Sequence, residues 1–174
     1  RMINANITTP TLFKAVFSFP NPVNEIAARL VATMVLTLAL ATIISGQWWL
    51  MPILAYGFLA RVMTGPTLSP MGLLATRVFV PWMGDRGRLV PGPPKRFAQS
   101  VGVVFSFTAL ALYFVTDGIT ASRIVLGVLS VFAALEAGLG FCAGCMVFNY
   151  AMRWGLIPES MCEECRVDYE LLAA

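Results

Sequence analysis

All four cysteines of the 174-residue chain fall in two C-x-x-C pairs near its end. Cys142 and Cys145 form the first pair, and Cys162 and Cys165 form the second, with 16 residues between the pairs. This spacing suits two dithiols that exchange electrons or sulfur. It also matches a zinc site with four cysteine ligands. The cysteines therefore predict either redox thiols or zinc binding, and both interpretations stay open.

The first pair falls within a long apolar stretch, so we expect Cys142 and Cys145 to lie on a continuous membrane helix. A spacing of three residues places both thiols on one helix face. Apolar surroundings should raise their pKa values and make them slow nucleophiles. The alternative is that they are small packing residues, helped by Gly140 and Gly144, whose spacing allows a close approach between helices.

The second pair follows a break at Gly155 and Pro158. Ser160 and Glu163 fit a capping box, which predicts a short helix at about 160–172. The cysteines at 162 and 165 would lie in its first turn, where the helix dipole favours a thiolate. Because proline cannot simply continue a helix, the break allows the chain to reverse. We therefore expect the four sulfur atoms to lie close together, with simple packing of an amphipathic tail as the alternative.

Glu136 is the only charged residue between Ile124 and Met152. A carboxylate inside a membrane is costly and marks a candidate functional site. The simpler expectation is an ion pair with Arg29 or Arg61, which the sequence places at comparable depth. A role in handling protons or a quinone is the weaker interpretation.

Charged residues make up 12% of the chain, about half of the roughly 25% that is usual in soluble domains. Together with long apolar runs, this composition predicts an integral membrane protein whose main partner is the lipid bilayer. No nucleic-acid partner is expected. The chain has no histidine, which excludes His-ligated haem or chlorophyll.

The apolar runs predict one all-α membrane domain over 1–174, built as a four-helix transmembrane bundle. The transmembrane helices are expected at about 24–45, 47–63, 97–116 and 120–154. An interfacial helix, too short to span, is expected at about 69–82, and Asn21 or Asn24 should cap the first helix.

Basic residues concentrate between the second and third predicted spans. They are Arg77, Arg86, Arg88, Lys95 and Arg96. The positive-inside rule places this segment in the cytoplasm, and four spans then place both termini there as well. The expected location is a bacterial inner membrane.

The sequence resembles a family of small bacterial membrane proteins described only as a domain of unknown function. The shared motifs are Asn-Pro-Val-Asn-Glu at 21–25, Pro-Gly-Pro-Pro-Lys-Arg-Phe-Ala-Gln at 91–99, Phe-Cys-Ala-Gly-Cys at 141–145 and Ile-Pro-Glu-x-x-Cys-x-x-Cys at 157–165. The resemblance implies a four-helix membrane bundle broadly like the DoxX-type proteins. It also implies a thioredoxin-like or rhodanese-like partner.

Two functions of different classes follow. The first is a membrane dithiol protein that passes reducing equivalents or sulfur between Cys162/Cys165 and Cys142/Cys145 at the cytoplasmic membrane face. The second is a non-catalytic accessory subunit of a larger membrane complex, in which the cysteines pack or bind zinc. Small-residue steps such as Ala134/Gly138 would suit the helix packing of such a subunit.

Overall fold

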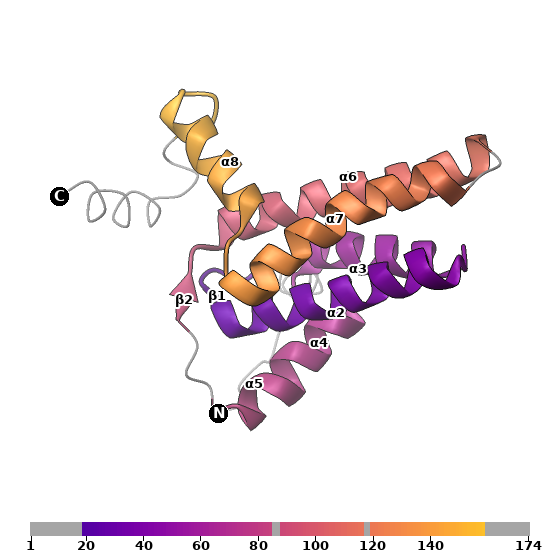
Figure 1. Ribbon diagram of the computed structural model, residues 1–174. Coiled ribbons are helices and arrows are strands. Elements are labelled where there is room, and N and C mark those ends of the chain that lie inside the picture. The colour runs from indigo at the N-terminus through magenta and orange to yellow at the C-terminus, as the bar shows by residue number, and fades with distance from the viewer. Residues whose placement is uncertain (1–18, 85–87, 117–118, 159–174) are drawn as a thin grey trace, which may run out of the picture.

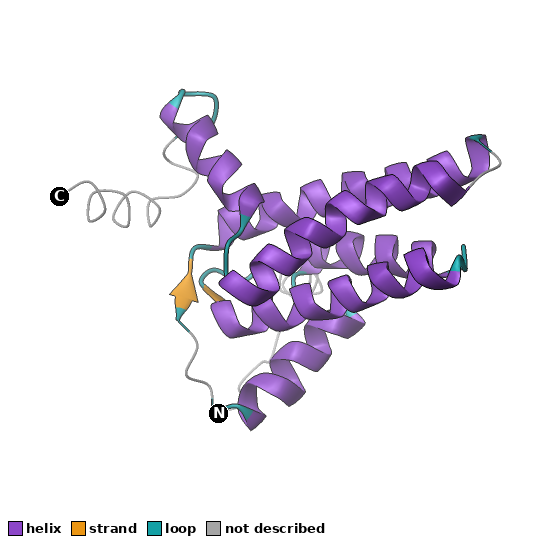
Figure 2. Ribbon diagram, viewed as in Figure 1, coloured by secondary structure: helices purple, strands orange, loops and turns teal. Residues whose placement is uncertain are grey.

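The computed structural model describes residues 19–84, 88–116 and 119–158, and these are almost entirely helical (Figures 1 and 2). Four helices form the bundle: α2 (Glu25–Ser45), α3 (Leu50–Thr64), α6 (Gly92–Val115) and α7 (Ile119–Leu139). The shorter elements are β1 (Val23–Asn24), α4 (Pro70–Leu74), η1 (Ala75–Phe79), α5 (Val80–Trp82), β2 (Leu89–Val90) and α8 (Ala143–Arg153). The all-α membrane architecture predicted from composition is confirmed.

The bundle is built from antiparallel neighbours, with α2 against α7, α3 against α6, and α6 against α7. Helices α2, α6 and α7 are long and apolar enough to cross a membrane. Helix α3 is also apolar, but its 15 residues extend only about 22 Å at the rise of an α-helix. The buried centre holds Val35, Met51, Leu54 and Leu126. Four helices therefore share one apolar core.

Helices α4, η1 and α5 form one helical segment, Pro70 to Trp82, where the sequence predicted a short helix at 69–82. Its middle winds as a π-helix, and the amide of Val80 bonds back five residues to Ala75. Pro81 follows at once and has no amide hydrogen to donate. The wider turn is consistent with the space that a proline ring requires.

Residues 21–25 hydrogen-bond to the starts of both α2 and α6. Asn24 caps α2 by accepting hydrogen bonds from the amides of Ile26 and Ala27, at 2.9 and 3.4 Å. Asn21 instead accepts one of 2.8 Å from the amide of Gly92, the first residue of α6. The short strands β1 and β2 pair antiparallel beside this contact. The cap on α2 is thus Asn24, one of the two predicted candidates.

The expectation of one continuous helix over 120–154 is wrong, because the chain bends after Leu139. Gly140 adopts the left-handed conformation, with φ of 69°. The amide of Gly140 donates back four residues to the carbonyl of Glu136, which is the bond of an αL cap, and the amide of Phe141 donates to the carbonyl of Leu135. Helix α8 then leaves the bundle in a different direction, as Figure 1 shows. The break places the first cysteine pair at a helix start.

Candidate functional site

Cys142 is the N-cap of α8, where its extended backbone precedes the first helical turn. The amide of Cys145 donates a hydrogen bond of 3.3 Å to the sulfur of Cys142. An amide at a helix start has no partner within the helix, and the dipole there favours negative charge. The predicted position of the pair inside a continuous helix is therefore wrong. The pair occupies the kind of position that activates a cysteine.

The two thiols are shifted in opposite directions. The hydrogen bond from the thiol of Cys145 lowers the pKa of Cys142, against the opposing effect of burial, and Lys95 and the Cys145 amide assist. The same hydrogen bond, followed by burial, raises the pKa of Cys145. The expectation of a raised pKa therefore fails for Cys142 and agrees with Cys145. Cys142 is therefore the thiol that forms a thiolate more readily, and Cys145 is the thiol that stays protonated.

An ion pair lies beside the cysteines. The ammonium of Lys95 on α6 meets the carboxylate of Glu136 on α7 at 2.6 Å, with side chains 9% and 17% exposed. The expected partners of Glu136, Arg29 and Arg61, are not its ion-pair partners. Helix α6 begins at Gly92, five residues before the predicted start at 97, so Lys95 lies inside the helix and reaches α7.

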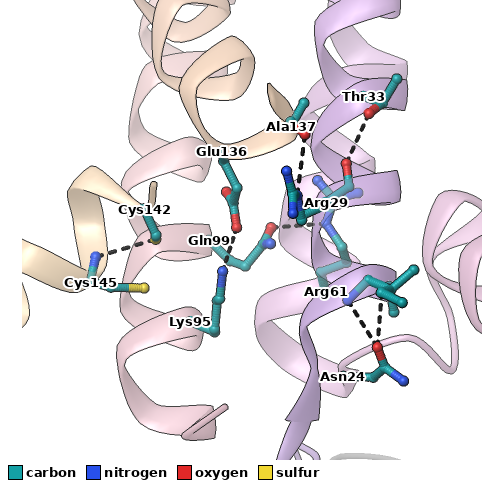
Figure 3. A network of polar contacts seen from close by, with 12 residues as sticks. Asn24, Arg29, Thr33, Arg61, Lys95, Gln99, Glu136, Ala137, Cys142 and Cys145 are labelled. Atoms are coloured by element: carbon teal, nitrogen blue, oxygen red, sulfur yellow. Dashed lines mark hydrogen bonds and ion pairs between the residues drawn. The ribbon is translucent and has the colours of Figure 1, made fainter. Parts of the chain in front are cut away.

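Arg29 hydrogen-bonds to the backbone of α7 instead of pairing with Glu136. Its guanidinium donates to the carbonyls of Ala137 and Gly138, at 3.3 and 2.5 Å. These carbonyls belong to the last turn of α7, where they have no partner in the helix. Arg29 therefore closes the end of α7 immediately before the chain turns toward Cys142 (Figure 3).

Arg61 on α3 is almost fully buried, with 4% of its surface exposed. Its Nε donates to Gln99 at 2.9 Å, and its Nη1 lies 3.6 Å from the sulfur of Met71. The guanidinium also stands 4.6 Å from the ring centre of Phe58. Its Nη2 is buried and has no hydrogen-bond partner among the residues that the structure describes.

Two cavities meet at Cys142. One, which we call the polar cavity, has a volume of 360 Å³. Its polar lining residues are Glu25, Arg88, Lys95 and Asn149, and both cysteines and several apolar residues complete its wall. The other, of 350 Å³, lies among the apolar faces of α2, α3, α6, α7 and α8, and Arg61, Gln99, Glu136 and Cys142 are its polar residues. Figure 3 shows both cysteines facing the Lys95–Glu136 pair, with Gln99 reaching toward Arg61.

The second cysteine pair, Cys162 and Cys165, lies outside the described residues, and so does the helix predicted at 160–172. The meeting of the two pairs thus stays a prediction. Within the described ranges, no cluster of three or more cysteine and acidic residues is arranged to hold a metal ion. A four-cysteine zinc site would need the second pair.

Sequence reasoning did not assign roles to Lys95 and Gln99. A signal for Lys95 was present, because Pro93 and Pro94 precede it and proline favours the first turn of a helix. The predicted start of the third span at about 97 left Lys95 outside the helix. No comparable signal identifies Gln99, since its contact with Arg61 depends on how α3 and α6 pack.

The fold and the site define a helical membrane protein with a dithiol at the start of a helix beside a buried ion pair. The chain belongs to the family described as Domain of unknown function (DUF4395), whose profile matches residues 23–153. The resemblance to a family of unknown function is thereby confirmed. No curated protein and no solved structure matches the chain, so the likeness to DoxX-type proteins stays an expectation.

Proposed function

We propose that the protein carries out thiol–disulfide exchange, with Cys142 as the attacking thiol and Cys145 as the resolving thiol. The observation that carries the proposal is the N-cap position of Cys142, whose sulfur accepts a hydrogen bond from the Cys145 amide. Thiolates are the reactive form of cysteine, and helix starts favour them. The polar cavity against both cysteines gives a water-soluble partner a route to the sulfur atoms.

The exchange has two balanced steps. The Cys142 thiolate attacks a partner disulfide, forms a mixed disulfide, and releases one partner sulfur, which takes up a proton. Cys145 then loses its proton and attacks the Cys142 sulfur, which forms the Cys142–Cys145 disulfide and frees the second partner thiol. The partner gains two electrons, and the reverse sequence oxidises a partner dithiol.

The proposed setting is the cytoplasmic face of a bacterial inner membrane, with both termini in the cytoplasm. Arg61, Arg88 and Lys95 line the two cavities that meet at Cys142, and Arg153 lies in the last turn of α8, which supports this orientation. A thioredoxin-like or rhodanese-like protein is the proposed partner. The pair Cys162/Cys165 would act as the second dithiol of the relay.

Trapping of the mixed disulfide tests the proposal. Cys145→Ser protein in nanodiscs, with Cys162→Ser and Cys165→Ser as background, should form a stable adduct with oxidised glutathione at Cys142. Cys142→Ser in the same background should form much less at Cys145, because burial still raises the pKa of that thiol after Cys142 is removed. Mass spectrometry of cysteine-containing peptides identifies the adduct. Equal adduct formation at both positions, or none at either, would refute the assignment.

Zinc binding and an accessory role are the competing functions. If the four cysteines hold zinc, the purified wild-type chain should carry one zinc ion, and each Cys→Ser variant should lose it. If the protein is an accessory subunit, a larger membrane assembly should keep its activity after Cys→Ser at all four positions. Either outcome would replace thiol exchange as the function.

A further inference from the structure

Arg61, which lines the apolar cavity and also a neighbouring cavity beside Phe19 and Gly65, carries a buried hydrogen-bond donor that the described residues leave unused. Arg61 is 4% exposed, and its Nη2 has no partner there, although its Nε and Nη1 contact Gln99 and Met71. A buried donor that lacks a partner destabilises the structure, and more so when it is charged. The arrangement suggests that a ligand oxygen accepts the remaining hydrogen bond.

The other residues that line the cavity indicate the chemical character of the rest of that ligand. Its walls are apolar side chains of five helices, including Val31, Phe58, Phe105 and Leu129. Its 350 Å³ lie at the lower end of the range of about 300–1,000 Å³ for small-molecule sites. The ligand is therefore an apolar molecule of modest size with an acceptor oxygen at one end.

The cavity also reaches the outer surface of the bundle. Two of its lining residues, Phe132 on α7 and Val147 on α8, are 40% and 56% exposed. The first of these helices is long and apolar enough to cross a membrane, so the outer surface beside it faces lipid. A lipid-soluble molecule can thus enter from the bilayer without crossing water.

Cys142 links this cavity to the polar one, because its side chain lines both. We propose that the apolar cavity binds a quinone, whose carbonyl oxygen accepts a hydrogen bond from Arg61 and which oxidises the Cys142–Cys145 dithiol. This inference rests on the proposed thiol exchange and names the electron acceptor of the same site. A long-chain carboxylate would also match Arg61, but it would leave the dithiol at the cavity wall without a role.

The reaction balances with the quinone as oxidant. The Cys142 thiolate adds to the quinone ring, and the Cys145 thiolate then attacks the Cys142 sulfur. The S–S bond forms as the sulfur–ring bond breaks, and two electrons pass to the ring. The two protons from the thiols end on the two quinone oxygens, which yields a quinol. A partner dithiol in the polar cavity can then restore the thiols by exchange.

Binding is tested apart from chemistry in the Cys142→Ser/Cys145→Ser protein, which cannot be oxidised at this site. Decylubiquinone and a short-chain menaquinone analogue should each be tried, since either ring type supplies the carbonyl. At least one should raise the melting temperature of this protein in detergent. Arg61→Met on the same background should weaken binding about tenfold or more, as expected for loss of a hydrogen bond from a charged donor.

Two matched variants test the position of the quinone in the cavity independently of Arg61. Val147→Phe narrows the cavity mouth and should weaken quinone binding. Val104→Phe adds the same bulk at a position that is 63% exposed on α6 and does not line the cavity, and it should leave binding unchanged. Equal effects of the two variants would overturn the placement of the ligand. Binding of oleate without binding of either quinone would overturn its chemical class.

Turnover is tested anaerobically with reduced protein that retains only Cys142 and Cys145. Decylubiquinone or the menaquinone analogue should yield one quinol for each pair of thiols lost, with a Cys142–Cys145 disulfide as the protein product. Normal exchange with oxidised glutathione but no quinol would overturn this inference and leave the proposed function standing. Arg61-dependent quinone binding without glutathione exchange would overturn the proposed thiol exchange and leave the quinone-binding cavity standing. Quinol formation by Cys142→Ser would overturn the route through this dithiol.

Discussion

Gly144 and Ala98 bring α8 and α6 so close together that no side chain fits between them. A Cβ atom placed on Gly144 would stand 2.6 Å from the Cβ of Ala98 and 2.7 Å from its Cα. Gly144 lies between Cys142 and Cys145 in the sequence. The contact therefore holds the dithiol at a fixed distance from Lys95, three residues before Ala98 on the same helix.

Substitution Gly144→Ala should push α8 away from α6. We expect a loss of about 1–3 kcal/mol of stability, typical of overpacking, and a mixed disulfide at Cys142 that forms more slowly. Thermal unfolding in detergent and adduct formation with oxidised glutathione measure the two effects. Gly138→Ala is the control, because a Cβ there meets nothing within 4 Å. Ala98→Gly should restore only part of the loss, because a Cβ on residue 144 would still stand 2.7 Å from the Cα of residue 98. Equal stability of Gly144→Ala and Gly138→Ala would argue against this contact as the cause.

Removal of one member of the ion pair should be worse than removal of both. Lys95→Met leaves the carboxylate of Glu136 without its partner in a mostly buried position, which costs about 3 kcal/mol. The double variant Lys95→Met/Glu136→Gln carries neither charge and should recover most of the loss. Thermal unfolding of the single and double variants measures the coupling. Additive losses would mean that the two side chains do not stabilise each other.

The two thiols should react with iodoacetamide in different pH ranges. Alkylation requires the thiolate, so its rate rises as pH increases through the pKa of each thiol. The pKa of Cys142 is lowered, chiefly by the hydrogen bond from Cys145, so Cys142 should react at a lower pH than an ordinary cysteine. Cys145 should react only at higher pH. Peptide mass spectrometry over a pH series gives both curves.

The variant Cys145→Ala tests whether the Cys145 thiol, rather than the position of Cys142 at a helix start, lowers the pKa of Cys142. It removes the thiol that donates to Cys142 but keeps the backbone amide. The alkylation curve of Cys142 should therefore move to higher pH, toward that of an ordinary thiol. A curve that does not move would assign the shift to the helix start or to Lys95 instead.

The orientation of the bundle is tested with single cysteines in a chain that lacks the native four. Gln47→Cys, in the turn between α2 and α3, should react with an impermeant maleimide added outside intact cells. Leu89→Cys, 62% exposed beside the basic segment, should react only after the membrane is opened. Basic residues stay on the cytoplasmic side, which is the physical reason for this expectation. The opposite labelling pattern would mean that the bundle lies in the membrane in the opposite orientation.

The long apolar runs made the membrane bundle predictable, because burial of an uncharged helix in lipid depends on composition alone. The break at Gly140 was less visible, since glycine also occurs within transmembrane helices and close helix packing offered another reason for it. Glu136 was recognised as important, but its partner depended on where α6 begins. The roles of Arg61 and Gln99 required the packed structure, because they follow from contacts between helices.

The contact between Lys95 and Glu136 also bears on how the chain enters the membrane. Lys95 lies near the start of α6 and Glu136 near the end of α7, and the two helices pack against each other with only residues 116–118 between them in the sequence. Each helix alone would bring an uncompensated charge to the translocon, at a substantial free-energy cost. When the two helices insert together, the charges of Lys95 and Glu136 neutralise each other. Helices α6 and α7 are therefore expected to insert as a pair during synthesis, before the first turn of α8 is set beside them.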